Sequence, residues 1–257
     1  MAEERFPQER YFLKDLVRHD IDFSQTDQRR DLPAPPLQKP CPPDLPRIDL
    51  PDGAAALEKL AVMPVGKAML RRQSVRKYSA DALSLQELAA LLWATQGVRR
   101  IANDATALRT VPSAGSRHTF ETTLAISRVE SLEPGLYRFL PFDNQLALLA
   151  ADQGIAAKAA EACLNQNFVR QAALTFFWTT LPARMEWRYD RAAHKVIAID
   201  AGHVCQNLYL VCESLGMGTC AIGAYDQAAC DALLGVDGKE EFTIYIAPVG
   251  KRSKEKP

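Results

Sequence analysis

The sequence has no excess of charge of either sign. Its 257 residues include 31 lysines and arginines and 31 aspartates and glutamates. An overall electrostatic field that would favour nucleic acid or an anionic membrane surface is therefore absent. We expect neither among the partners of this protein, and any anion site must be built locally.

Long apolar runs are also missing. No window approaches the roughly 20 apolar residues that a transmembrane helix needs, and the opening residues MAEERFPQERYF are charged where a secretory signal would be apolar. We therefore expect a cytoplasmic protein. The cysteines form no CxxC pair and no regular spacing, which predicts reduced thiols, mostly in the core. They are Cys41, Cys163, Cys205, Cys212, Cys220 and Cys230.

Several catalytic motifs do not occur. No GxGxxG follows a predicted strand, which argues against a dinucleotide-binding Rossmann fold. The histidines His19, His118 and His194 form no HExxH and no spaced ligand set, so we expect no metal. Neither a GxSxG motif nor a pair of carboxylates suggests hydrolysis.

Proline is concentrated in one segment. Residues 32–51 read LPAPPLQKPCPPDLPRIDLP, with eight prolines, a density that excludes helix and interior strand. The segment is either an extended arm docked on the domain or on a partner chain, or a disordered linker. Because Ile48 and Leu50 alternate with polar residues, we favour a docked arm. We divide the chain into an N-terminal arm, residues 1–52, and one domain, residues 53–257.

The rest of the chain alternates helical and strand patterns. The clearest helix begins at Ser84, which forms a capping box with Glu87, and stops at Gly97. Further helices are predicted over residues 54–60, 66–72, 155–164, 193–215 and 226–234. Strands are predicted over residues 122–130, 173–181, 219–223 and 241–250, with a hairpin over 135–150 that turns near Asp143 and Asn144. This order predicts a layered α+β fold with a mainly antiparallel central sheet flanked by helices.

Two short segments have the composition of a ligand site. Arg72, Ser74 and Arg76 form an R-x-S-x-R pattern in which two guanidinium groups and a hydroxyl could surround one dianion. The alternative is a solvated helix end. Residues 112–115 read PSAG, and side chains this small let backbone amides approach a flat or phosphorylated ligand. Here the alternative is a plain surface turn.

The order of these motifs along the chain carries a family resemblance. It runs R-x-S-x-R, LLWATQG, R-x-x-PSAG, E-x-x-L, GLYRF, GHVCQNLYL, LGMGTCAIGAYD and PVGK. The sequence thereby resembles the flavin-dependent nitroreductase superfamily, and within it is most similar to the SagB-type dehydrogenases, which oxidise azoline rings in peptides. The resemblance extends from about residue 50 to residue 252, and the proline-rich arm also looks like the lead-in of that group.

The resemblance implies an FMN cofactor and a homodimer with the flavin site at the subunit interface. The residues implied to hold the phosphate are Arg72, Ser74 and Arg76, with Lys251 and Arg252 closing from the C-terminal side. Those implied to border the isoalloxazine ring from the neighbouring subunit are Pro112, Ser113, Ala114 and Gly115. Backbone N–H groups near the ring's N5 are implied for Ala221, Ile222, Gly223 and Ala224. The helix through Val204, Leu208 and Val211 has the apolar character of an interface, or is a central core helix.

One departure from the SagB pattern concerns a possible catalytic pair. Azoline oxidases of that group carry Lys-Tyr where this sequence has Arg188 and Tyr189. Arginine stays protonated and cannot act as a general base, which argues against azoline oxidation. Tyr189 can donate a proton or orient a substrate, or is a structural tyrosine on a loop. His203, within the long apolar helix, is interpreted as a structural core residue.

Three functional hypotheses follow. The first is an FMN-dependent oxidoreductase of the SagB-type branch that transfers hydride through flavin N5 on a small or peptide-derived substrate. The second is a nitro or quinone reductase that takes hydride from NADH or NADPH, and the third is a non-catalytic flavin-binding partner of a modification complex. The aromatic residues within 165–193 are expected to line the substrate pocket.

Overall fold

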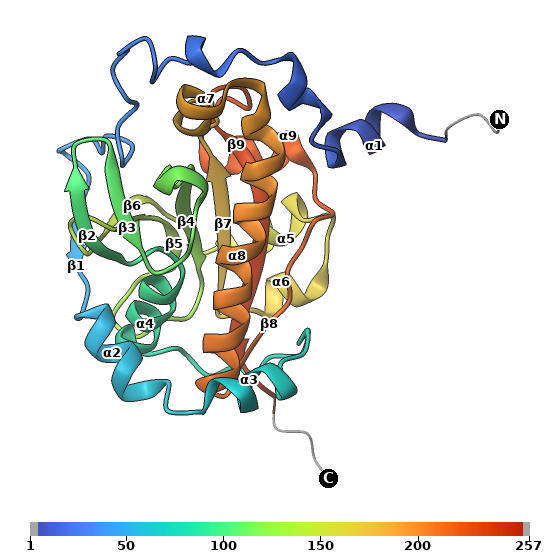
Figure 1. Cartoon of the computed structure of the whole chain (residues 1–257). Helices are drawn as coiled ribbons and strands as arrows, with labels where there is room; N and C mark the ends of the chain where they lie inside the picture. The colour runs from blue at the N-terminus through green and yellow to red at the C-terminus, as the bar shows by residue number, and fades with distance from the viewer. Residues whose placement is uncertain (1–4, 254–257) are drawn as a thin grey trace.

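The computed structural model describes residues 5–253, so the two ends of the expected arm and domain, residues 1–4 and 254–257, lie outside it (Figure 1). The helices are α1 Pro7–Leu13, α2 Gly53–Leu60, α3 Val65–Arg71, α4 Leu85–Gln96, α5 Ile155–Ala162, α6 Asn167–Gln171, α7 Ala183–Tyr189, α8 Ala193–Ser214 and α9 Gln227–Leu234. The strands are β1 Arg47–Asp49, β2 Val98–Asn103, β3 Thr106–Arg109, β4 Phe120–Ile126, β5 Gly135–Leu140, β6 Gln145–Ala151, β7 Leu174–Thr180, β8 Met217–Thr219 and β9 Phe242–Lys251.

The central sheet is antiparallel throughout the described residues. Its seven strands follow the order β1-β6-β5-β4-β7-β9-β8, and each neighbouring pair is antiparallel. Strands β2 and β3 form a separate two-stranded hairpin. The layered α+β fold with a mainly antiparallel sheet, expected from the order of elements, is confirmed.

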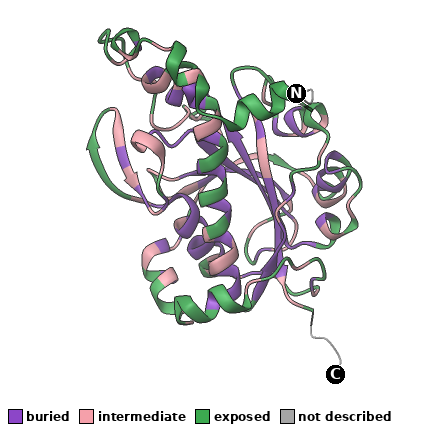
Figure 2. Cartoon of the chain, turned by 45° about the vertical axis from the view of Figure 1, so that its right-hand side comes forward, coloured by how far each residue is buried: buried purple, intermediate pink, exposed green. Residues whose placement is uncertain are grey.

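Helices cover both faces of the sheet. Strand β7 is buried along its whole length, as its apolar sequence predicts, and Figure 2 shows the strands at the centre of the sheet buried. Phe176 and Trp178 of β7 pack in one apolar cluster with α4 and α8. Phe177, which points to the opposite face, packs in a second cluster with α5 and α9.

The two most clearly predicted helices form as expected. Ser84 accepts a hydrogen bond from the backbone N–H of Glu87, whose carboxylate accepts from the backbone of Ser84, so the capping box begins α4. Helix α8 extends over 22 residues. The face proposed for a dimer interface needs correction, because Val204, Leu208 and Val211 are buried in the chain's own core.

Several elements differ from those predicted from the sequence. The strand expected over 122–130 is β4 and ends at Ile126, and the strand expected over 219–223 ends at Thr219 as β8. Beyond it, Ile222 makes only an isolated bridge to Ile246 of β9. The β2–β3 hairpin and helices α1, α6 and α7 were not predicted.

The proline-rich segment lies on the domain. Strand β1 adds an edge to the sheet by pairing with β6, and three buried arginines donate to backbone carbonyls of the segment. These bonds run from Arg184 to Pro36 (2.8 Å), from Arg109 to Leu37 (3.1 Å) and from Arg138 to Pro40 (2.9 Å). A proline-rich chain has few N–H donors but keeps every carbonyl, so buried arginines are suited to bind it.

Two further observations bear on the expected class of protein. All six cysteines are free thiols, and five of them are buried, as predicted. Within the described residues, no helix combines the length and the apolar character needed to span a bilayer.

Candidate functional site

The R-x-S-x-R segment runs along the outer edge of the sheet. Arg72 is the C-cap residue of α3, and the chain then lies against β8 and β9, where Val75 donates a backbone hydrogen bond to Thr219 (2.9 Å). Two glycines make this approach possible. A Cβ at Gly218 would lie 2.4 Å from a methyl carbon of Val75, and one at Gly250 would lie 2.9 Å from the ring of Tyr78. Larger residues at these positions would push the segment off the sheet.

The segment lines a cavity of about 640 Å³. Its walls are Gln73, Ser74, Val75, Arg76, Lys77, Arg252 and Ser253. Three of the expected phosphate ligands, Ser74, Arg76 and Arg252, are therefore brought together. Arg72 does not line the cavity; its guanidinium lies over the ring of Tyr209, 5.3 Å from the ring centre.

The charges of this region are not equally available. Glu213 is buried and pairs with both Arg71 (3.1 Å) and Arg252. Lys251 does not line the cavity, and its Nζ lies 3.4 Å from the carboxylate of Glu87. Among the described residues, no carboxylate lies within 4 Å of Arg72 or Arg76. These two guanidinium groups, like the ammonium of Lys77 on the cavity wall, therefore have no carboxylate partner in the described chain.

Tyr209 connects this segment to the turn that follows β8. Its hydroxyl accepts a hydrogen bond from the backbone N–H of Ala221 (2.8 Å) and lies 3.0 Å from the hydroxyl oxygen of Ser74. Ile222 is buried against β9, whereas Gly223 and Ala224 are exposed. Among the described residues, none accepts a hydrogen bond from the N–H of Gly223 or Ala224. The turn can therefore present these donors to a ligand.

The PSAG turn, Pro112 to Gly115, carries the second half of the candidate site. Gly115 has φ +56°, and a Cβ there would lie 2.6 Å from Cδ of Arg188 and 2.8 Å from the hydroxyl of Tyr189. The Arg188–Tyr189 pair, at the end of α7 rather than on a loop, therefore packs directly against this turn. Glycine is suited to both the left-handed backbone and the close approach.

Asp200 of α8 holds the same turn in place. Its carboxylate accepts a hydrogen bond from the N–H of Ala114 (3.2 Å). Burial raises the pKa of this carboxyl, while its hydrogen bonds to Ser113 and Ala114 oppose the rise. His203 lies one turn further along α8 with its Nδ1 3.8 Å from Asp200. Its side chain is 45% exposed, so the interpretation of His203 as a core residue is wrong.

The two halves of the candidate site lie at different levels of α8. Asp200 is hydrogen-bonded to the PSAG turn, whereas Tyr209, nine residues later, contacts the R-x-S-x-R segment and the turn after β8. Nine residues of α-helix rise about 13 Å. A single chain therefore does not bring the PSAG turn against the expected phosphate ligands.

Sequence reasoning missed Tyr209 and Asp200. Both lie in or near the GHVCQNLYL motif on α8, but their partners are Ser74, Ala114 and Ala221, which are distant in sequence. Within residues 5–253, no group of three or more His, Cys, Asp and Glu side chains is arranged to hold a metal ion.

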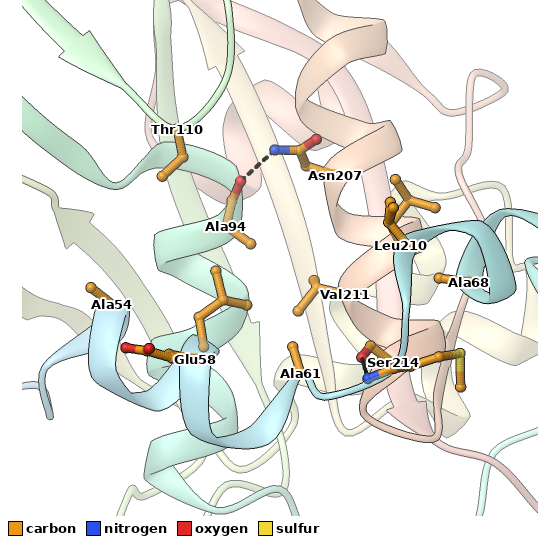
Figure 3. Close-up of a pocket in the computed structure, with 13 residues that line it drawn as sticks. Ala54, Glu58, Ala61, Ala68, Ala94, Thr110, Asn207, Leu210, Val211 and Ser214 are labelled. Carbon is orange, nitrogen blue, oxygen red and sulfur yellow. Dashed lines mark hydrogen bonds between the residues drawn. The ribbon is translucent and has the colours of Figure 1, made fainter.

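A second cavity borders α8 on its groove with α2, α3 and α4. It has a volume of about 510 Å³ and is mainly apolar, with Leu57, Val65 and Leu210 among its lining residues. Figure 3 shows Asn207 of α8 hydrogen-bonded across it to the carbonyl of Ala94 in α4 (2.8 Å). Among the described residues that line this groove, Glu58 is the one ionisable group.

Comparison with known proteins gives a consistent family. A profile of the Nitroreductase family matches residues 69–251. A protein assigned as a nitroreductase from Methanocaldococcus jannaschii is 29% identical over 209 residues, which cover 81% of this chain and 98% of that protein.

Solved structures agree with this assignment. A nitroreductase-type protein from Ralstonia eutropha is 25% identical, with a TM-score of 0.67 over 87% of this chain and 100% of that one. One from Anabaena variabilis is 26% identical, with a TM-score of 0.65 over 82% of this chain, which spans only 42% of that longer protein. One chain in the structure of the Escherichia coli microcin synthetase McbBCD complex, at 13% identity, has the same fold, with a TM-score of 0.60 over 98% of this chain and 99% of that one.

Proposed function

The chain belongs to the nitroreductase family and is an oxidoreductase, and from this premise we propose that it binds FMN and acts in the SagB-type branch of the family. The observation that carries the proposal is the group around Ser74. Arg72 and Arg76 lack carboxylate partners among the described residues, and Tyr209 connects Ser74 to the turn at Ala221. A phosphate would neutralise the two guanidinium groups, and the bidentate geometry of arginine suits it.

The residues present fit the cofactor. The phosphate would be held by Arg72, Ser74 and Arg76 beside a cavity of about 640 Å³. Arg252 supports this wall, although its pairing with Glu213 leaves it less charge to offer. Lys251 is engaged with Glu87, so we assign it a supporting role only. When bound, FMN supplies the site for hydride transfer at its N5; the exposed N–H groups of Gly223 and Ala224 would orient that edge.

We further propose a homodimer that shares the flavin site. The PSAG turn and the phosphate ligands lie beside positions of α8 that are about 13 Å apart along the helix. If two α8 helices paired antiparallel about a two-fold axis, the PSAG turn of one subunit would lie beside the phosphate ligands of the other. The exposed face of α8 supports this arrangement. It carries Ala198, Ile199, Gly202, His203 and Gln206, and Figure 1 shows α8 crossing the front of the molecule. The dimer interface would also cover the adjoining apolar groove between α8 and helices α2, α3 and α4.

The substrate is proposed to be small or peptide-derived. The fold is shared with the microcin synthetase complex, whose structure contains a truncated pro-MccB17, and this likeness supports the SagB-type assignment. In the reaction, Tyr189 is positioned to donate a proton or orient the substrate, and Arg188 contributes a fixed positive charge. The division into an arm, residues 1–52, and a domain, residues 53–257, is part of the same proposal, as is a cytoplasmic location.

The alternative of a nicotinamide-driven nitro or quinone reductase uses the same flavin site. The test is an anaerobic titration of purified, FMN-loaded protein with NADH and NADPH, followed by loss of the oxidised flavin absorbance. Flavin that binds in one-to-one ratio and stays oxidised supports a dehydrogenase whose substrate supplies the hydride. Rapid bleaching by either nucleotide identifies the reductase, and failure to bind FMN overturns the proposal as a whole.

A further inference from the structure

A small cavity lies between the N-terminal segment and the end of α7, separate from the groove and from the cavity beside Ser74. Its volume is about 180 Å³, and it is lined by Arg18, Phe23, Thr26, Gln28, Arg29, Arg188 and Tyr189. Figure 1 shows the N-terminal segment passing over α7. The N–H of Gln28 donates to the carbonyl of Trp187 (2.9 Å), and the indole of Trp187 donates to Leu32 (2.9 Å), so this wall is fixed to the body of the protein.

The charged side chains that line the cavity are all positive. Three of its lining side chains are guanidinium groups and none is a carboxylate. Arg18 pairs with Asp15 outside the cavity (2.7 Å). In the described part of the chain, no carboxylate lies within 4 Å of Arg29 or Arg188. Two of the three cations therefore face the cavity without a counter-charge.

A fourth arginine lies close to this group. Arg117, buried nearby under the ring of Trp187 at 4.9 Å, has its pKa lowered by burial and by repulsion from Arg188. Arg188 itself lies over the ring of Tyr189, 5.6 Å from its centre, and Arg18 lies over Phe23 at 5.3 Å. These contacts position the cations beside aromatic walls. An anion in the cavity would relieve repulsion that the chain's own residues leave in place.

We propose that this cavity binds the carboxylate end of the substrate, with Arg29 and Arg188 as its charged ligands. The volume accommodates a carboxylate and a few atoms attached to it, so the rest of the molecule must extend out of the cavity. Arg188 and Tyr189 also contact Gly115 in the PSAG turn, which the proposed function places beside the flavin ring. The role as a substrate site rests on that function. Binding of the carboxylate itself does not.

The experiment uses calorimetric titration of FMN-loaded protein with sodium benzoate, because bound FMN already fills the phosphate site near Ser74. Benzamide, which has nearly the same shape and no charge, is the matched probe. The variant is Arg29→Gln, and the control is Arg30→Gln, which removes the same charge from the next residue, also exposed, that does not line the cavity. Charge-assisted hydrogen bonds are stronger than neutral ones, so we expect Arg29→Gln to raise the benzoate dissociation constant about tenfold. Arg30→Gln should change it less than about twofold, because Arg30 does not line the cavity and the effect of its charge is screened by solvent.

Each result decides the proposal. Benzoate that binds more tightly than benzamide, with the loss confined to Arg29→Gln, supports it. Equal binding of the two probes, equal losses in both variants, or tighter binding of phenyl phosphate than of benzoate overturns it. Repeating the titration without FMN separates the two proposals. Protein that fails to bind FMN but binds benzoate through Arg29 refutes the proposed function alone, whereas protein that binds FMN and does not discriminate benzoate refutes the carboxylate site alone.

Discussion

Replacing Tyr209 by phenylalanine tests how the candidate site is held together. The substitution keeps the aromatic ring under Arg72 and removes only the hydroxyl, which accepts from Ala221 (2.8 Å) and contacts Ser74 (3.0 Å). Each hydrogen bond of this kind contributes about 0.5–1.5 kcal/mol net. Ala221 is only partly buried, so water can replace part of the loss. We expect the free energy of unfolding to fall by about 1–2 kcal/mol.

The same change should weaken FMN binding. The hydroxyl holds the phosphate segment and the turn after β8 in one arrangement, and a loosened site must be ordered again when the cofactor binds. A loss of about 1.4 kcal/mol in this pre-organisation corresponds to a tenfold higher dissociation constant. Quenching of FMN fluorescence on titration measures the affinity, and urea unfolding of the cofactor-free protein measures the stability.

A matched control separates the site from general stability. Tyr137 lies on β5, four strands from β8 in the sheet order, and Tyr137→Phe removes a hydroxyl that donates to the carbonyl of Glu133 (2.7 Å). It should lower stability by about 1 kcal/mol and leave the FMN affinity unchanged. The role assigned to Tyr209 is refuted if Tyr209→Phe binds FMN as tightly as the unmodified protein, or if Tyr137→Phe weakens FMN binding equally.

The remaining predictions address charge, assembly and pH. Alanine at both Arg72 and Arg76 should weaken FMN binding by several kcal/mol, because charge-assisted hydrogen bonds contribute about 1.5–3 kcal/mol each; unchanged flavin retention after gel filtration would contradict the phosphate assignment. A Cβ at Gly202 meets open space, so Gly202→Glu should leave the subunit folded. It should prevent dimer formation in sedimentation and weaken flavin binding, and an intact dimer would rule out the α8 interface. Burial lowers the pKa of His118 to about 3, below its unfolded value, so protons bind the unfolded state first and stability must fall as pH drops below about 6.5. Between pH 7.5 and pH 5 this group alone should remove about 2 kcal/mol, and His118→Asn, which tolerates the positive φ at this position, should lose less over the same range in urea unfolding.

The fold was largely predictable for the elements whose structure depends on a few neighbouring residues. The capping box of Ser84 and Glu87 and the apolar run of β7 both report structure that is set within a few residues, and both elements formed as expected. The β2–β3 hairpin was missed because Val98–Asn103 is mostly exposed and carries no alternation of buried side chains. Ile222 was taken into a strand on its apolar character, yet the chain leaves the sheet after Thr219 and returns for one bridge.

The candidate site was predictable only in its linear motifs. Arg76 and Ser74 could be proposed from their spacing, since both lie in one extended segment and line one cavity. The pairing of Glu213 with Arg252 joins residues 39 positions apart, and no local pattern reports it. The roles of Tyr209 and Asp200 likewise depend on how α8 packs against distant turns. These contacts follow from tertiary packing.

The arginine at position 188 gives the pair at the end of α7 a different chemistry from the Lys-Tyr pair of azoline oxidases. A lysine in a desolvated site can lose its proton and act as a base, whereas arginine keeps its charge and offers a planar set of donors. Here that fixed charge lies beside Tyr189, against Gly115 and on the wall of a cavity with Arg18 and Arg29. A permanent cation in such a place suits recognition of a negatively charged group better than removal of a proton. Tyr189 is then the member of the pair that can exchange a proton with the substrate, and the substitution Arg188→Lys should weaken carboxylate binding while leaving Tyr189 in place.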